Sequence, residues 1–336
     1  YLFVAVLCID VLYTGTADGN IVRITGKQIE KIARIGGDCE GPWEEEICGR
    51  PLGMRFDKNR NLYVLDAYYG LMHVNVRTGA VTPLLPYTEY INEKKLVFPN
   101  DLTIDDKGII YFTDASTRWP LNRAIFNVLE HDNHGRIIKF DPSTKETEVL
   151  LENLYFPNGI QLAADGKSLL IAESNKLRII RYYFRGPNKG KKTVFARLPG
   201  EPDNIRPSKN GGYWVALCFG RHAGSPTLID WLAPYPAIRT LVARLLHATG
   251  TVLHYFSQFV SSPAVKSCAH LVESGRFFFS LMPRYGMVVE LDKKGKIIRS
   301  LQSSDGQVAM LSEVLEHNGN LYIGSFINPF LLKLKA

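Results

Sequence analysis

The residues best suited to chemistry in this sequence are amides and carboxylates that stand at one fixed distance from a turn glycine. Each lies eight residues before its glycine, within the strings FPNDL, FPNGI and EPDNI. The proline in each string fixes how the chain approaches the following segment. The residues are Asn100, Asn158 and the pair Asp203 and Asn204. Their shared offset predicts that these side chains lie at the same depth of the fold.

A set of oxygen atoms gathered at one depth is typical of a site for a hard cation. A buried amide or carboxylate without a partner costs about 1–3 kcal/mol. Ca²⁺ satisfies several such groups together, because it accepts six to eight oxygens, including neutral carbonyls. The set contains neither Cys nor His, which disfavours Zn²⁺. The alternative is that these side chains only cap turns at strand starts; three sites in matched register favour the cation.

One further carboxylate is expected to face the same space. Glu313 lies six residues before Gly319, which places it two positions further along its strand than the asparagines. An offset of two keeps a side chain on the same face of a strand. The alternative for Glu313 is a salt bridge at the rim. The matching place in the second repeat is the apolar Leu52.

These residues must be positioned by a repeated unit of aromatic strands. A turn with Gly or Asn, an aromatic-rich strand, a polar turn and a second strand recur six times, about 45 to 60 residues apart with one longer interval. Val, Ile, Tyr and Phe dominate the runs, and Gly, Asp and Asn punctuate them, as in hairpins. The copies lie at 11–35, 61–85, 108–151, 167–184, 211–301 and 320–335.

Units of this size predict an all-β fold, a single six-bladed β-propeller over residues 1–336. The segment before each aromatic strand would be the innermost strand and would line the central channel. A β-sandwich is the competing all-β fold, but a sandwich gives no reason for one phrase to repeat six times.

One stretch has the period of a helix. Apolar residues recur at i, i+3, i+4, i+7 and i+8 spacing in 236–256, namely Ile238, Leu241, Val242, Leu245 and Leu246. The segment 225–256 interrupts the fifth blade, so we expect it on a propeller face, as a lid over the channel or a membrane-contacting helix. A plainly packed helix is the alternative. Residues 257–281 do not fit the repeat and are an atypical insertion.

Composition excludes several classes of protein. Apolar residues make up 46% and charged residues 22%, which is ordinary for a packed domain and excludes disorder as the main state. The run Leu2 to Ile9 is far shorter than the roughly 20 residues of a membrane span. The net charge of +7 is spread without an aromatic-interleaved stripe. We therefore expect no nucleic-acid partner and a basic surface suited to anionic lipid. A start at Tyr1 indicates a fragment or processed form, so an upstream signal or anchor would lie outside it.

Taken together, the motifs resemble the strictosidine synthase-like family from about residue 10 to the C-terminus. They include GTADG (15–19), CGRPLG (48–53), DAYYGL (66–71), FPNDLT (98–103), FPNGIQL (156–162), PDNIRPS (202–208) and EVLEHNGNLYIGSF (313–326). The family is a six-bladed propeller related to the paraoxonases and to gluconolactonase-type enzymes. The resemblance thus implies the fold that the repeats predict.

The resemblance also implies roles for single residues. In the wider superfamily a channel Ca²⁺ is held by an Asn from each of two blades, an Asp-Asn pair from a third and a Glu from the first. The matching ligands here are Asn100, Asn158, Asp203 and Asn204. Asp101 matches the residue that paraoxonases use for a second, structural Ca²⁺. Glu313 matches the glutamate that acts as base in plant strictosidine synthase.

Several positions depart from the family. The first-blade Glu should fall near Phe3, where the chain reads YLFVAV, and the two paraoxonase His positions hold Leu52 and Ala67. Plant strictosidine synthase lacks the channel asparagines that this chain keeps, so the alkaloid condensation is not supported. The family places a disulfide in the loop CEGPWEEEIC, which implies a Cys39–Cys48 bridge and an oxidising compartment. Two free thiols are the alternative.

The expected function is Ca²⁺-dependent hydrolysis of a small-molecule ester or lactone, of the arylesterase type, with Glu313 or Asp203 activating water. The resemblance implies a membrane-associated protein of the secretory pathway, with its propeller in the lumen of the endoplasmic reticulum or outside the plasma membrane. The alternative function is a non-catalytic membrane-associated propeller that binds protein partners. A strictosidine synthase-type lyase comes third.

Overall fold

Short antiparallel strands make up most of the chain. The computed structural model describes residues 4–8, 11–221, 226–260 and 262–336, with residues 4–8 as backbone only. Within these residues the strands form six sheets of three or four strands and one two-stranded ribbon. Each sheet is a simple meander, in which every strand pairs with the next strand along the chain.

The strands are grouped by sheet as follows. The first sheet holds β1 (Val4–Cys8), β2 (Val11–Gly15), β3 (Asn20–Thr25) and β4 (Gln28–Arg34). The second holds β5 (Pro51–Phe56), β6 (Leu62–Asp66), β7 (Gly70–Val74) and β8 (Val81–Pro86), and is followed by the ribbon β9 (Tyr90–Ile91) and β10 (Lys94–Lys95). The third holds β11 (Pro99–Ile104), β12 (Ile110–Asp114), β13 (Gly135–Phe140) and β14 (Thr147–Leu154).

The second half of the chain continues the pattern. The fourth sheet holds β15 (Pro157–Leu162), β16 (Ser168–Glu173), β17 (Arg178–Tyr183) and β18 (Lys192–Arg197). The fifth holds β19 (Gly200–Pro207), β20 (Tyr213–Gly220), β21 (Gly286–Leu291) and β22 (Ile297–Ser303). The sixth holds β23 (Leu311–His317), β24 (Asn320–Ser325) and β25 (Leu332–Lys335).

The first strands of the sheets contact one another in a closed ring. β1 contacts β5, and the contacts continue through β11, β15 and β19 to β23, which returns to β1. A ring of meanders whose first strands face a common axis is a β-propeller, so the all-β propeller prediction is confirmed. The predicted innermost segments, β11, β15, β19 and β23, are the strands nearest this axis. The hydrophobic core lies between neighbouring sheets, as where Tyr13 of the first sheet meets Phe56 of the second with ring centroids 5.3 Å apart.

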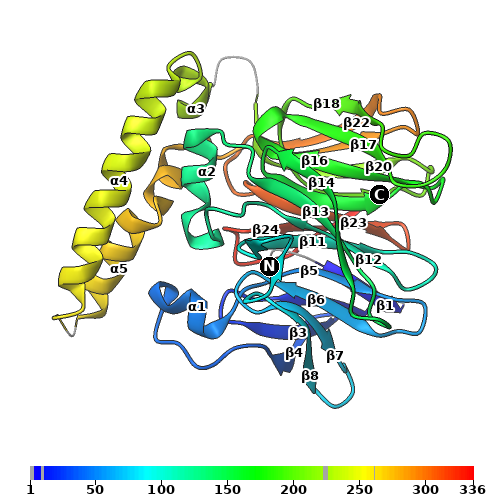
Figure 1. Cartoon of the computed structure of the whole chain (residues 1–336), viewed down its shortest axis with the longest axis horizontal. Coiled ribbons are helices and arrows are strands. Elements are labelled where there is room, and N and C mark those ends of the chain that lie inside the picture. The colour runs from blue at the N-terminus through cyan, green and yellow to red at the C-terminus, as the bar shows by residue number, and fades with distance from the viewer. Residues whose placement is uncertain (1–3, 9–10, 222–225, 261) are drawn as a thin grey trace.

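The helices gather at one side of the sheets (Figure 1). They are α1 (Glu45–Cys48), α2 (Ala124–Glu130), α3 (Leu228–Leu232), α4 (Pro236–Ser257) and α5 (Pro263–Glu273), followed by the 3₁₀ turn η4 (Arg276–Leu281). The segment from α3 to η4 stands between β20 and β21 of the fifth sheet, where the helical interruption was expected. α4 covers the whole predicted segment 236–256 and packs on both α5 and α2.

The atypical insertion at 257–281 forms α5 and η4 and completes a helical hairpin with α4. The two helices approach closely at Gly250, where a β-carbon would lie 2.4 Å from the Cα of Glu273. Glycine is required there because any side chain would meet the neighbouring backbone. Within the described residues, no helix is both long and apolar enough to cross a bilayer.

Candidate functional site

A repeated irregularity of the innermost strands positions the predicted ligands. The register of β11 with β12 shifts between Pro99 and Leu102, and β15 and β19 shift at the corresponding places. The residues inside these bulges are Asn100, Asp101, Asn158, Gly159, Asp203 and Asn204. A bulge adds a residue to one strand and re-aims its side chain. The shared offset in the sequence therefore reflects one bulge repeated in three blades.

Two glycines let the bulged strands approach each other. A β-carbon on Gly159 would lie 2.6 Å from the Cα of Asn204, and one on Gly53 would lie 2.7 Å from the Cα of Asp101. Glycine at these positions allows neighbouring backbones to come within contact distance. The polar side chains of adjacent blades are thereby brought to one level of the channel.

The three asparagines leave their amide oxygens without partners. The Oδ1 atoms of Asn100, Asn158 and Asn204 are buried and accept no hydrogen bond from the part of the chain that the structure describes. An unpaired buried oxygen costs about 1–3 kcal/mol, so three together call for a ligand. Asp203 is also buried, and burial, with the nearby charges of Glu313 and Asp101, raises its pKa well above the usual range.

This donor set fits a calcium ion. Three neutral amide oxygens and one carboxylate are hard ligands of the kind Ca²⁺ accepts. The described residues contain no group of three His, Cys, Asp or Glu side chains that could hold a metal, so an acidic or thiolate site is not the arrangement here. The predicted place of the missing first-blade glutamate, near Phe3, lies outside the described residues.

A buried arginine that the sequence reasoning missed lies against two of the predicted residues. The guanidinium of Arg206 donates from Nη1 to Asp101 Oδ2 at 2.8 Å and from Nη2 to Glu313 Oε2 at 2.6 Å. Arg55 adds a second cation, 3.6 Å from Asp101 Oδ1. Arg206, Asp101 and Glu313 are all fully buried. The channel thus contains an internal ion cluster next to the amide oxygens.

Asp101 is part of this ion cluster, and its expected role as a ligand of a second, structural Ca²⁺ stays a prediction. Its Oδ2 accepts the backbone N–H of Ile160 at 3.0 Å as well as Arg206 Nη1, and its Oδ1 accepts Arg206 Nη2 at 3.2 Å. Both carboxylate oxygens are therefore hydrogen-bonded, and Arg206 supplies a positive charge beside them. Arg206 lies two residues beyond Asn204 on the same strand, so the alternation of side chains was the signal that could have found it.

Glu313 is held by the same cluster. Its Oε2 accepts from Arg206 and, at 3.5 Å, from Nδ2 of Asn204. Burial raises the pKa of Glu313, although the charges of Arg206 and Arg55 act to lower it. Because the amide nitrogen of Asn204 points to Glu313, its oxygen is left for a cation. Glu313 is thus paired with a guanidinium and hydrogen-bonded to the amide of Asn204, and its expected role as a base stays a prediction.

A cavity of about 380 Å³ lies over the amide oxygens. Its polar part includes Asn100, Asn158 and Asp203, with Ser174, Glu201 and Cys218 beside them. The rest of its wall is largely apolar and includes Leu52, Phe98, Phe156, Phe219, Phe279 and Phe326. Leu52 makes an apolar wall where paraoxonases carry a His. The size is that of a small-molecule site, for which about 300–1,000 Å³ is usual.

Glu201 is a further cavity carboxylate that was not predicted from the sequence, although it opens the string EPDNI. Burial raises the pKa of Glu201 to about 7, and Arg221, 3.5 Å away, acts to lower it. The thiol of Cys218 donates to the backbone oxygen of Glu201 at 3.3 Å. Burial also raises the pKa of this thiol well above its usual range, so it is not a ready nucleophile.

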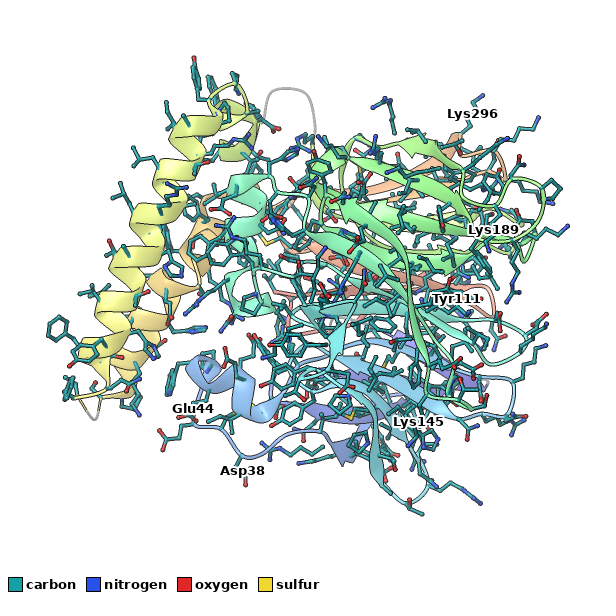
Figure 2. The ribbon with its side chains drawn as sticks, in the orientation of Figure 1. Asp38, Glu44, Tyr111, Lys145, Lys189 and Lys296 are labelled. Atoms are coloured by element: carbon teal, nitrogen blue, oxygen red, sulfur yellow. A yellow bond between two sulfur atoms is a disulfide. The ribbon has the colours of Figure 1, made fainter. Side chains whose placement is uncertain are left out.

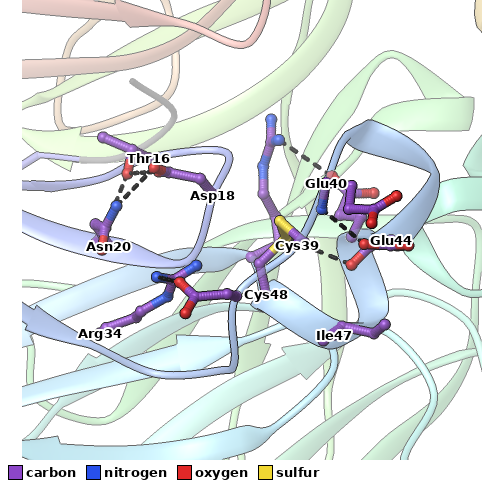
Figure 3. The surroundings of a disulfide bond; sticks show 12 residues. Thr16, Asp18, Asn20, Arg34, Cys39, Glu40, Glu44, Ile47 and Cys48 are labelled. Atoms are coloured by element: carbon purple, nitrogen blue, oxygen red, sulfur yellow. Dashed lines mark hydrogen bonds and ion pairs between the residues drawn. A yellow bond between two sulfur atoms is a disulfide. The ribbon is translucent and has the colours of Figure 1, made fainter. Parts of the chain in front are cut away.

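The cavity is covered by the helical side of the molecule. Ile125 and Val128 of α2 and Phe279 of η4 line it from that side. The predicted Cys39–Cys48 disulfide is present and closes the loop that leads into α1 (Figure 3). This loop reaches α5, where Lys266 Nζ lies 3.5 Å from Glu40 Oε2. The insertion at 257–281, in which the sequence gave no sign of chemistry, therefore supplies part of the cavity wall.

Comparison with known proteins gives two kinds of relative. A family model, Strictosidine synthase, matches residues 100–187. Adipocyte plasma membrane-associated protein of Salmo salar is 42% identical over 97% of this chain and 73% of its own length. The protein of the same name from Homo sapiens is 40% identical over the same shares. The Drosophila melanogaster relative, named with the addition Hemomucin, is 31% identical over 97% of this chain and 57% of its own length.

Solved structures share the fold at low sequence identity. A gluconolactonase of Xanthomonas campestris superposes with a TM-score of 0.59 and 15% identity, over 97% of this chain and 82% of its own. A luciferin-regenerating enzyme gives 0.53 and 11%, over 96% and 83%. A chain of a nidogen/laminin complex gives 0.57 and 12%, over 97% and 89%. The fold is thus found in enzymes and in a protein–protein complex.

Proposed function

The chain belongs to the strictosidine synthase-like family, together with the adipocyte plasma membrane-associated proteins, and we propose that it is a Ca²⁺-dependent hydrolase of a small ester or lactone. The observation that carries the proposal is the set of three buried, unpartnered amide oxygens, from Asn100, Asn158 and Asn204. They adjoin the carboxyl of Asp203 beneath an apolar cavity. The gluconolactonase-like neighbours support this class of activity by analogy of fold only.

The residues of the chain have distinct tasks in this proposal. A bound Ca²⁺ would supply Lewis-acid polarisation of the substrate carbonyl and stabilise negative charge on its oxygen. Asn100, Asn158 and Asn204 would hold it through their unpartnered Oδ1 atoms, and Asp203 would add the charged ligand. Asp203 also lines the cavity, so its carboxylate is the group that takes the proton of the attacking water.

Arg206 and Glu313 act indirectly. Arg206 neutralises Asp101 and Glu313, and Glu313 in turn fixes the amide of Asn204. The base suggested by the plant enzyme is replaced in this proposal by Asp203, because Glu313 is occupied by the guanidinium.

A second candidate function is a membrane-associated propeller that binds proteins without catalysis. It is favoured by the apolar Leu52 and Ala67 at the paraoxonase His positions and by the pairing of Glu313 with Arg206. The likeness to a chain of the nidogen/laminin complex is compatible with it. The two candidate functions differ in one testable respect: only the hydrolase should show esterase activity that depends on a bound metal.

Hydrolysis of phenyl acetate by the full chain tests the proposal. We expect a Ca²⁺-dependent rate that chelator abolishes, and a loss of at least about tenfold in Asn158→Ala and in Asp203→Asn. Asn188→Ala is the matched control, because Asn188 is an exposed asparagine in a surface turn. A rate that chelator leaves unchanged in a folded protein would favour the non-catalytic candidate.

Membrane association is proposed to use the outer face of α4. Leu241 and Leu245 are 56% and 59% exposed there. The 22 residues of α4 contain no Asp or Glu, and the exposed Arg244 complements an anionic bilayer surface, whereas Arg239 is buried. Figure 2 shows Lys189 and Lys296 on the far side of the sheets from α4. The lysine clusters and the helical face therefore cannot lie on one flat membrane together.

Liposome binding separates these faces. We expect anionic vesicles to bind the full chain and to protect 236–257 from hydrogen exchange, and Leu245→Glu to weaken binding. Ile29→Glu is the matched control, because Ile29 is 58% exposed but lies on β4 of the first sheet. Equal loss in both variants, or unchanged protection of α4, would contradict the proposed orientation.

A further inference from the structure

Two arginines surround one buried glutamate in the wall of the cavity. Arg50 donates from Nη1 to Glu45 Oε1 at 3.1 Å, and Arg276 donates from Nη2 to Oε2 at 2.7 Å. The hydroxyl of Tyr68 donates to the same Oε2 at 2.9 Å. Glu45, Arg50 and Arg276 all line the cavity. Glu45 and Arg50 come from α1 and the segment just after it, and Arg276 comes from η4, so two distant parts of the chain build this group.

Two guanidiniums of this group share one directly bonded carboxylate. Although burial alone would raise it, the two guanidiniums hold the pKa of Glu45 below its usual value, so this carboxylate is ionised. Asp66 is a second carboxylate near Arg50, but its Oδ1 accepts the backbone N–H groups of Tyr68 and Tyr69, and within the described residues it has no hydrogen bond to either guanidinium.

Arg50 also has unused hydrogen-bonding capacity. Its side chain is 13% exposed, and its Nε is buried with no hydrogen-bond partner in the described part of the chain. A guanidinium has five N–H donors in a planar fork, and a buried donor without a partner is costly. The most favourable partner for this donor is an acceptor that also carries negative charge, such as a carboxylate.

The remaining wall indicates what such an acceptor is attached to. Aromatic and aliphatic side chains from β5, α2, η4 and the residue before β11 line the cavity, including Leu52, Phe98, Ile125, Val128 and Phe279. An apolar enclosure with a cationic patch is complementary to an amphipathic molecule bearing a single negative charge.

We infer that the cavity binds a small carboxylate with an apolar body, whose charged end contacts Arg50 and Arg276. The identification of this carboxylate with the substrate rests on the proposed function, because the ester or lactone, or the acid released from it, would then carry the carboxylate. Binding of the anion itself requires neither metal nor hydrolysis.

Calorimetric titration of the full chain with octanoate and with octanamide, both in chelator, tests the inference. The two probes share size and apolar chain and differ in charge. We expect octanoate to bind at least about tenfold more tightly, and Arg276→Gln to reduce this preference to less than about threefold, while Arg276→Lys keeps part of it. Arg23→Gln, which breaks an exposed Arg–Glu pair on the first sheet, is the matched control.

Glu45→Gln provides a second test, in which octanoate binding should strengthen instead of weaken. Removing the carboxylate that both arginines bind should tighten octanoate binding if the patch receives an anion, and should not if the cluster is purely structural. Thermal midpoints establish that each variant is folded. Equal affinity for both probes, no binding of either, or an unchanged preference in Arg276→Gln would overturn the inference. If one of these results is found while Ca²⁺-dependent esterase activity is present, the inference fails and the proposed function stands. If octanoate binds with the expected preference but no esterase activity is found, the proposed function fails and the inference stands.

Discussion

We predict that substituting Arg206 strongly lowers the stability of the protein, and that a compensating substitution in the same ion cluster restores much of it. Arg206→Met removes the guanidinium but keeps most of the side-chain volume, which leaves Glu313 buried without its partner at 2.6 Å and Asp101 with only Arg55, 3.6 Å away. Breaking a buried ion pair in this way costs about 3–5 kcal/mol. At about 2 °C per kcal/mol for a chain of this size, the thermal midpoint should fall by roughly 6–10 °C.

A charge-balanced double variant separates charge from packing. Glu313→Gln added to Arg206→Met removes the stranded charge and leaves Asp101 paired with Arg55, 3.6 Å away, so most of the lost stability should return, as it does when buried ion pairs become neutral groups of similar volume. Arg136→Met breaks another buried pair, with Asp114 at 2.9 Å, and should destabilise comparably without affecting Ca²⁺ binding. The reasoning is refuted if Arg206→Met costs less than about 1 kcal/mol, or if the double variant is no more stable than the single one.

Two further predictions concern the region around the cavity. Cys39→Ser with Cys48→Ser opens a bridge of sequence separation 9 and should cost about 2–3 kcal/mol; a non-reduced digest with both thiols free would contradict the bridge itself. Burial raises the pKa of Asp66 from 3.8 to about 6, so the folded state retains the proton and this group's stability is lost as pH rises through about 6. Asp66→Asn should therefore gain about 2 kcal/mol relative to wild type between pH 4 and pH 7, and a thermal midpoint difference that does not change with pH would refute this.

The sequence predicted the strands and the level of the asparagines because both depend on local spacing. Gly, Asn and Asp mark the turns, and the same bulge recurs where FPNDL, FPNGI and EPDNI begin their strands. The number of residues between a side chain and the turn glycine therefore predicts how deep in the channel that side chain lies.

The pairing of side chains across the channel did not follow from spacing. Asp101 and Arg206 are 105 residues apart and come from different blades, so only the closed ring brings them together. The same holds for Glu45 and Arg276, which are separated by 231 residues. Arg276 belongs to the insertion, which has no counterpart in the repeat from which a position could be predicted.

Calcium titration of the full chain by calorimetry, with Asn158→Ala and the surface control Asn188→Ala, tests the central claim most directly. The unpartnered Oδ1 of Asn158 predicts saturable single-site binding to the wild type and the control, weakened at least about tenfold in Asn158→Ala. It also predicts that chelator lowers the thermal midpoint of the wild type. Absence of binding heat from the folded protein, together with a midpoint that chelator leaves unchanged, would contradict the account.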